Sequence, residues 1–166
     1  MTYARVRLPA DVEAEIRVQC ERAYPLEACG AIFGRGDGES EPWTVVAIRP
    51  APNQHGDDQR RRYLVPPEFQ MLAEREARRQ DQDVIGYFHS HPDHPAQPSE
   101  YDRVYAWAGY LYAICAVARG KATDLNAFAL EQQGGAFRAV HIDKTPDSSP
   151  SPSPPHSPSQ NHPEDR

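Results

Sequence analysis

The chain has 166 residues, a net charge of −6 from 18 Lys+Arg against 24 Asp+Glu, and three cysteines. Its length fits one domain with a core large enough to fold alone. Its excess of acidic residues argues against a protein that binds nucleic acid by neutralising phosphates. Three cysteines without a CxxC pair do not form a disulfide framework. The longest uncharged stretch that is rich in apolar residues, 104–118, is shorter than the about 20 residues that span a membrane. Residues 1–20 lack the apolar run of a signal peptide, so we expect a cytoplasmic protein.

Hydrophobic periodicity predicts a mixed α/β (α+β) domain. The first helix is indicated by apolar residues at helical spacing, and the strands by short apolar runs between turn residues. In chain order, the predicted elements are a helix over 10–23, strands over 28–33 and 43–49, a short strand over 62–65, a helix from Pro66 to about Gln80 with Phe69, Leu72 and Ala73 facing inward, a strand over 83–89, a helix from Ser99 to about Ala108, and strands over 110–118, 124–131 and 136–142.

The composition changes after Lys144. Residues 145–166 contain seven of the 17 prolines and six serines, and no large apolar side chain. Such a segment cannot bury enough surface to offset the entropy lost on ordering. We therefore predict a folded domain over 1–144 and a disordered Pro/Ser-rich tail over 145–166.

The segment with the clearest chemical pattern begins at His89-Ser90-His91-Pro92. In an extended strand, residues i and i+2 point to the same face, so the two imidazoles converge. The proline-rich loop that follows brings Asp102, in the first turn of the next helix, back toward them. Three such ligands leave a fourth tetrahedral position open, which is typical of a catalytic zinc site, although nitrogen and oxygen donors do not exclude other divalent metals.

Two further residues are candidates for catalysis. A water activated by a metal needs a general base, and among the acidic residues we select Glu27, at the start of an apolar strand. The hydroxyl of Ser99 could donate a hydrogen bond to the oxyanion that forms on the attacked carbonyl.

Structural explanations exist for each of these residues. An HxH pair on a strand is usually coincidental, Glu27 alone would be a solvated acid at a strand edge, and Ser99-x-x-Asp102 also matches a helix capping box. A cysteine nucleophile would need a paired histidine, whereas the apolar surroundings of Cys20, Cys29 and Cys115 favour small core residues.

Taken together, Pro-x-Glu-x-Cys-Gly at 25–30, His-Ser-His-Pro at 89–92 and Ser-x-x-Asp at 99–102 resemble the signature of the JAMM (MPN+) zinc metalloproteases. The resemblance covers residues 5–142 in the family's element order and implies a mixed, largely antiparallel curved sheet packed with helices, similar to cytidine deaminases. It implies that His89, His91 and Asp102 hold Zn²⁺, that Glu27 acts on the water, and that Ser99 supports the tetrahedral intermediate.

The resemblance also implies a substrate. Family members cleave the peptide or isopeptide bond after the C-terminal Gly-Gly of ubiquitin-like proteins. The compact chain is more similar to the small prokaryotic branch, whose partners are sulfur carriers of the ThiS/MoaD/CysO type. Two alternatives remain: a non-catalytic, zinc-stabilised module that binds a ubiquitin-fold partner, and a metallohydrolase of small amides.

Overall fold

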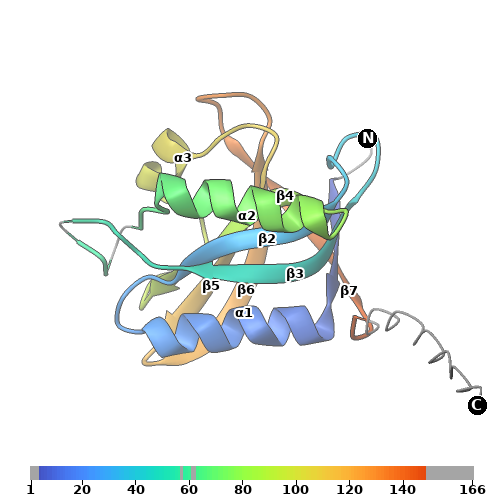
Figure 1. The fold of residues 1–166 in the computed structure, drawn as a ribbon. Helices are drawn as coiled ribbons and strands as arrows, with labels where there is room; N and C mark the ends of the chain where they lie inside the picture. The colour runs from blue at the N-terminus through green and yellow to red at the C-terminus, as the bar shows by residue number, and fades with distance from the viewer. Residues whose placement is uncertain (1–3, 57, 61–62, 149–166) are drawn as a thin grey trace, which may run out of the picture.

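The computed structural model describes residues 4–56, 58–60 and 63–148. In this part of the chain, seven strands close into a barrel in the order β1-β3-β2-β4-β5-β6-β7, and three helices accompany them (Figure 1). The elements are β1 (Arg5–Pro9), α1 (Ala10–Ala23), β2 (Cys29–Arg35), β3 (Trp43–Ala51), α2 (Pro67–Arg79), β4 (Asp83–Pro92), α3 (Glu100–Tyr105), β5 (Leu111–Ala118), β6 (Lys121–Leu130) and β7 (Phe137–Thr145).

The barrel mixes strand directions. The pairs β1–β3, β1–β7 and β4–β5 are parallel, and the other four neighbouring pairs are antiparallel. This confirms the predicted mixed α/β class with a largely antiparallel sheet. β4 lies between β2 and β5, so the strand that ends in the histidine pair has a hydrogen-bonded neighbour on each side.

The first helix is confirmed from Ala10 to Ala23. Its buried residues Val12, Ile16 and Cys20 recur every four positions and therefore share one face. This face packs into the main core cluster together with residues of the barrel strands, including Phe88 of β4. The helix is thus anchored to the same core as the strand that carries the histidines.

Helix α2 covers another face of the sheet, across β2 and β3 from α1 in Figure 1. Ala73 and Ala77 are buried against Ala31 and Phe33 of β2. The prediction that Leu72 faces inward is wrong, because its side chain is 61% exposed. Positions 73 and 77 face the sheet, and a neighbouring position on a helix is turned about 100° away from that face.

Two predicted elements need correction. Tyr63–Val65 is not a strand; Leu64 instead donates its N–H to the Asn53 side chain and accepts from the Gln54 N–H, and the predicted residue 62 lies outside the described part. The helix after Ser99 ends at Tyr105 rather than near Ala108.

Two side chains explain why α3 is short. The amide of Gln133 accepts a hydrogen bond from the Ala108 N–H and donates one to the Ala106 carbonyl. The hydroxyl of Tyr112 accepts another from the Trp107 N–H. These contacts satisfy backbone groups that a longer helix would have paired internally. In addition, β1 was not predicted as a strand, although Val6 and Leu8 are buried and alternate with exposed arginines.

At the C-terminal end, β7 extends to Thr145, and Ser148 donates its backbone N–H to Asp11. The remainder of the predicted tail, 149–166, lies outside the described residues, so its disorder stays a prediction. In the described ranges, no helix is long and apolar enough to cross a membrane.

Candidate metal centre and active site

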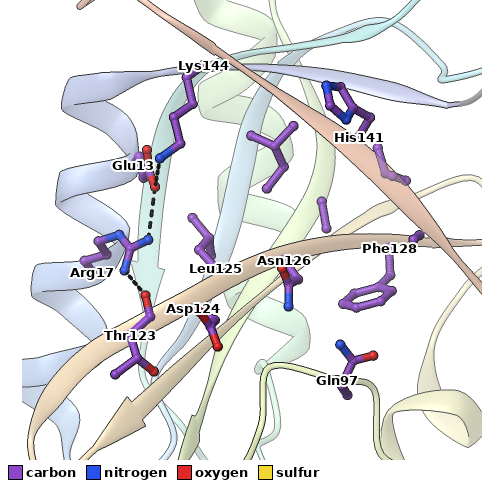
Figure 2. Close-up of a pocket in the computed structure, with 14 residues that line it drawn as sticks. Glu13, Arg17, Gln97, Thr123, Asp124, Leu125, Asn126, Phe128, His141 and Lys144 are labelled. Atoms are coloured by element: carbon purple, nitrogen blue, oxygen red, sulfur yellow. Dashed lines mark hydrogen bonds and ion pairs between the residues drawn. The ribbon is translucent and has the colours of Figure 1, made fainter.

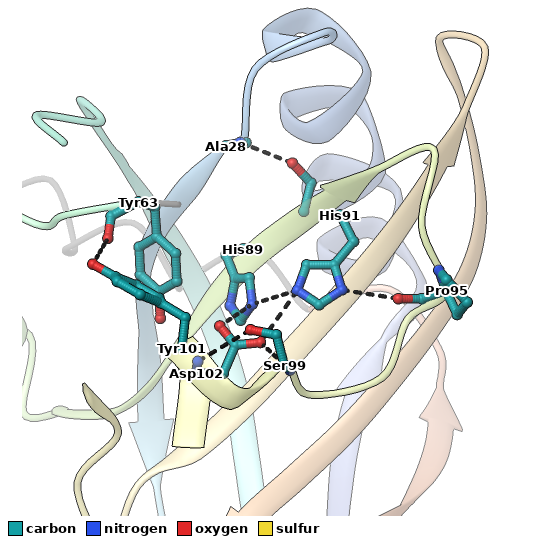
Figure 3. A network of polar contacts seen from close by, with 9 residues as sticks. Ala28, Tyr63, His89, His91, Pro95, Ser99, Tyr101 and Asp102 are labelled. Carbon is teal, nitrogen blue, oxygen red and sulfur yellow. Dashed lines mark hydrogen bonds and ion pairs between the residues drawn. The ribbon is translucent and has the colours of Figure 1, made fainter. Parts of the chain in front are cut away.

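The two histidines lie near the end of β4 and point to the same side. His89 and His91 are 1% and 7% exposed, and their Nε2 atoms are 3.1 Å apart. The Asp102 carboxylate completes the group: Oδ1 lies 3.1 Å from Nε2 of His89, and Oδ2 lies 3.2 Å from Nε2 of His91 (Figure 3). The structure thus brings together the three residues that the sequence proposed as ligands.

Asp102 is held in place by the start of α3. Its Oδ2 accepts the Ser99 N–H at 2.7 Å, and its own N–H donates to Ser99 Oγ at 3.1 Å, which makes a complete capping box. The capping explanation for this pair is therefore correct, and the same geometry also directs the carboxylate toward the imidazoles. Because Ser99 Oγ acts here as an acceptor, its hydroxyl hydrogen remains free to be donated elsewhere.

The ligand atoms of these three residues are better suited to binding a shared cation than to contacting one another. All three residues are buried, and their ligand atoms lie within 4.8 Å of one another. His91 Nδ1 is 2.8 Å from the Pro95 carbonyl, which requires a proton on Nδ1 and leaves the lone pair of Nε2 facing the other donors. Lone pairs of imidazole and carboxylate repel one another at such distances unless a cation or a proton lies between them. This group could therefore hold a metal ion.

The spacing also fits. A tetrahedral zinc ion bound at 2.0–2.1 Å keeps its ligands about 3.4 Å apart, close to the observed 3.1–3.2 Å. The ring of His89 is stacked on Tyr63 with centroids 4.5 Å apart, and its Nδ1 is buried without a hydrogen-bond partner in the described part of the chain. A bond to a cation through Nε2 would offset the cost of burying this polar ring.

The electrostatics keep the donor set in its ligating form. Burial lowers the pKa of His89, outweighing the opposing effect of Asp102, so the imidazole is neutral. Burial would raise the pKa of Asp102, but the neighbouring His89 and His91 and the hydrogen bond from the Ser99 amide hold that pKa well below its usual range. Neutral imidazole and ionised carboxylate are the forms that bind metals.

Glu27 lies directly before β2 and is buried, with 5% of its surface exposed. Its N–H donates to the Gln59 carbonyl at 2.7 Å. Glu27 lines a cavity of about 280 Å³ together with His91, His94 and Ser99, and it also borders a second cavity of about 330 Å³ beside the end of α1. The register of β2 on β4 explains the approach, because Cys29 pairs with His89 and residues just before Cys29 lie beside the end of β4.

In the metal-free protein, we expect Glu27 to make unfolding depend on pH. Burial, and then the negative charges of Asp102 and Asp58, raise the pKa of Glu27 to about 9, whereas an unfolded glutamate titrates near 4.3. Between these values the folded chain holds a proton that the unfolded chain releases, so the free energy of unfolding falls as pH rises. In thermal melts of chelator-treated protein, Tm should fall less steeply from pH 5 to pH 9 for Glu27→Gln than for wild type. Equal slopes would contradict this effect.

The other histidines and cysteines have separate positions. His94 lines the cavity beside Glu27, His55 packs edge-on against Tyr101, and His141 lies in β7. Burial, and then Glu27, raise the pKa of Cys29 to about 12. This thiol stays protonated, which argues against a cysteine nucleophile.

Sequence reasoning missed an aromatic pocket beside the candidate metal centre. Asp102 forms part of its wall, and its volume is about 180 Å³. Trp107 and Tyr105, 64% and 65% exposed, lie at its rim. The remaining walls come from the residues before α2 and from α2, β4, α3 and β5. They are Tyr63, Leu64, Val65, Gln70, Tyr87, Tyr101 and Tyr112.

A larger cavity of about 520 Å³ lies elsewhere, between α1 and the diverging strands β6 and β7 (Figure 2). Glu13 bridges two cations at its wall, Arg17 at 3.1 Å and Lys144 at 3.4 Å. Arg17 also donates to the Thr123 carbonyl. None of the candidate site residues lines this cavity, and its charges neutralise one another.

Comparisons with known proteins agree with this geometry. Residues 9–131 match the family described as prokaryotic homologs of the JAB domain. A desampylase from Haloferax volcanii is 32% identical over 147 residues, covering 86% of this chain and 98% of the relative.

Two solved structures are similar in fold. A solution structure of a protein from Salinibacter ruber is 32% identical, with a TM-score of 0.65 and coverage of 94% of this chain and 98% of its own. A protein from Desulfitobacterium hafniense, 24% identical, gives a TM-score of 0.72 with coverage of 86% and 94%. With the family model matched over most of its length, the chain belongs to the prokaryotic JAB-domain family.

Proposed function

We propose that the protein is a zinc-dependent peptidase that hydrolyses the peptide or isopeptide bond after the C-terminal Gly-Gly of a ubiquitin-like protein of the sulfur-carrier type. The observation that carries the proposal is the buried His89, His91 and Asp102 group, beside a cavity that Glu27 and Ser99 also line. The name of the Haloferax relative, desampylase, supports deconjugation of a ubiquitin-like protein as the reaction class.

In this proposal, His89 and His91 through Nε2, and Asp102 through its carboxylate, hold Zn²⁺. A donor set of nitrogen and oxygen atoms without thiolate suits a catalytic zinc. When bound, zinc polarises the scissile carbonyl and lowers the pKa of a coordinated water to near 7. The Pro95 carbonyl fixes the orientation of the His91 ring, as backbone acceptors commonly do for histidine ligands.

The proton is moved by Glu27. Its carboxylate takes a proton from the attacking water and later gives it to the leaving amine, so that one group serves as base and then as acid. Without a metal, burial raises the pKa of Glu27 to about 9. The positive charge of a zinc ion bound beside it would lower that pKa, so that Glu27 would be ionised and able to act as the base near neutral pH. Ser99, with its hydroxyl hydrogen free, donates to the oxyanion of the tetrahedral intermediate.

The aromatic pocket next to Asp102 provides a place for the carrier's tail. Two glycines have no side chains to clash with a narrow cleft, so an extended Gly-Gly segment can reach the buried centre. An apolar side chain upstream of them would then reach the rim formed by Tyr105 and Trp107. This apolar side chain of the carrier would be bound by burial of its surface against the aromatic rings.

We expect Trp107→Ala to weaken substrate binding more than catalysis. Removing an aromatic side chain at a desolvated contact costs more than about 1 kcal/mol, so KM should rise about tenfold while kcat stays within about twofold. Leu72→Ala is the matched control, since Leu72 is equally exposed but lies outside the pocket. Steady-state kinetics on a carrier substrate give both constants. An equal change in KM for Trp107→Ala and Leu72→Ala would argue against this docking surface.

The proposed function is tested by mass spectrometry of a sulfur-carrier protein extended beyond Gly-Gly, incubated with the chain. We expect loss of the extension, inhibition by a chelator, and recovery on addition of zinc. Binding that survives chelation without any product would favour the non-catalytic module. Cleavage of small amides that an intact carrier does not inhibit would favour the small-amide hydrolase. Cytoplasmic location and the absence of nucleic-acid partners stay predictions from composition.

A further inference from the structure

The segment that carries Glu27 is tied to the end of β4 at two points. On its C-terminal side, the Ala28 N–H donates to Ser90 Oγ at 2.8 Å, and the Ser90 N–H donates to the Ala28 carbonyl at 3.1 Å. On its N-terminal side, the hydroxyl of Tyr24 donates to Asp93 Oδ2 at 2.7 Å. Residues 90 and 93 flank His91, and residues 24 and 28 flank Glu27.

Asp93 is itself fixed by the strands around it. Its backbone N–H donates to the Val117 carbonyl at 2.7 Å, and its Oδ1 accepts the Arg119 N–H at 2.9 Å. Its φ of +55° is a left-handed conformation that aspartate tolerates better than most residues. The carboxylate thus joins three segments: the end of β4, the β5–β6 turn and the residues that follow α1.

We propose that Tyr24 and Asp93 are positioning residues for Glu27. Their hydrogen bond, together with the Ser90–Ala28 pair, fixes residues 24–28 against β4, so that the Glu27 carboxyl faces the cavity it shares with His91. This inference rests on the proposed function for its kinetic consequence. Neither residue lines that cavity, so neither is expected to touch the reacting atoms.

The principal test is Tyr24→Phe, which removes one hydroxyl and leaves the ring. Misplacing a catalytic group by about 1 Å can lower the rate about a hundredfold. Tyr24→Phe removes the Tyr24–Asp93 hydrogen bond but keeps the Ala28–Ser90 pair, so we expect kcat to fall about tenfold. KM and zinc content should stay within about twofold. Tyr110→Phe is the control, since Tyr110 makes ring contacts with Tyr87 away from Glu27.

Variants of Asp93 test the same bond from its other side. Asp93→Gly keeps the positive φ but removes the bonds to both Tyr24 and Arg119, so it should lower kcat at least as much as Tyr24→Phe. The double variant should lose no more than about twofold beyond Asp93→Gly, because both substitutions remove the same Tyr24–Asp93 contact. Asp93→Asn can accept from Arg119 and donate to Tyr24, so it should recover most of the loss. Asp81→Gly is the matched control, because Asp81 has the same φ of +55° in the turn before β4.

Amide hydrogen exchange gives a readout that is independent of activity. The Glu27 N–H, bonded to the Gln59 carbonyl, should exchange about tenfold faster in Tyr24→Phe, while the Ile32 amide in β2 should not change. Unchanged exchange and unchanged kcat in Tyr24→Phe and Asp93→Gly would overturn the inference, as would a loss of kcat explained by lost zinc. If the wild-type chain cleaves no carrier, the proposed function fails, and the exchange rates alone decide whether this bond holds the segment.

Discussion

Replacing Glu27 by glutamine is expected to lower kcat by at least about a hundredfold while zinc content is unchanged. The amide has nearly the shape of the carboxyl but cannot take a proton from water at neutral pH, and a positioned general base contributes about 10²–10⁴ in rate. Glu27 is outside the His89, His91 and Asp102 group, so removing its charge leaves the donors in place. KM should change little, since the loss falls on the transition state.

The measurement is single-turnover cleavage of an extended carrier, with zinc determined by elemental analysis on the same sample. Glu15→Gln serves as the control, because it makes the same chemical change on the exposed face of α1. A Glu27→Gln variant that cleaves at the wild-type rate would remove this residue from the mechanism. A variant that loses zinc together with activity would instead make Glu27 part of the metal site.

His89→Ala is expected to abolish stable zinc binding and, with it, cleavage. Loss of a residue that only supports a ligand typically costs 10–100-fold in metal affinity, so loss of one of three ligands should cost at least about a hundredfold. The variant should bind less than about one-tenth of an equivalent of zinc after dialysis, and zinc should no longer raise its Tm, because a ligand stabilises only the state that binds it.

His94→Ala is the matched control, since His94 lines the same cavity but is not one of the three grouped donors. It should retain zinc. Circular dichroism checks that His89→Ala is folded, because His89 is also packed in the interior. Full zinc occupancy in folded His89→Ala would refute its role as a ligand.

Hydrophobic patterns within short segments predicted those helices and strands whose burial is reflected in their own sequence. The apolar residues of α1 at every fourth position and the nearly continuous apolar run of β5 are signals that burial imposes on a sequence, and both elements are where they were expected. The grouping of His89, His91 and Asp102 was predictable for the same reason. His89 and His91 share a strand, and Asp102 follows after one short loop.

The deviations depend on contacts between distant residues. Gln133 and Tyr112 end α3 early, and Asn53 replaces a strand partner for Leu64. These side chains lie outside 99–108 and 62–65, so the hydrophobic pattern within those segments could not predict their contacts. Likewise, the aromatic pocket gathers residues from Tyr63 to Tyr112, so it becomes visible only when the chain is folded.

The position of Glu27 was predicted partly from its local sequence and depends partly on contacts between distant residues. The sequence gives no distance between position 27 and a histidine pair about 60 residues later, and the selection of Glu27 depended on its place before an apolar strand and on the family resemblance. The antiparallel register of β2 on β4, with Cys29 opposite His89, brings the two together. The hydrogen bonds of Tyr24 and Ala28 to the end of β4 then fix the approach.

We propose that one metal ion is bound between two imidazoles and one carboxylate, with Glu27 facing it. Anomalous diffraction from crystals of the zinc-loaded protein, collected on both sides of the zinc absorption edge, would locate this ion. We predict a single strong peak within about 2.0–2.2 Å of His89 Nε2, His91 Nε2 and a carboxylate oxygen of Asp102, with the Glu27 carboxyl group in the adjoining cavity. Zinc bound elsewhere, or a Glu27 side chain turned away from the ion, would contradict the account.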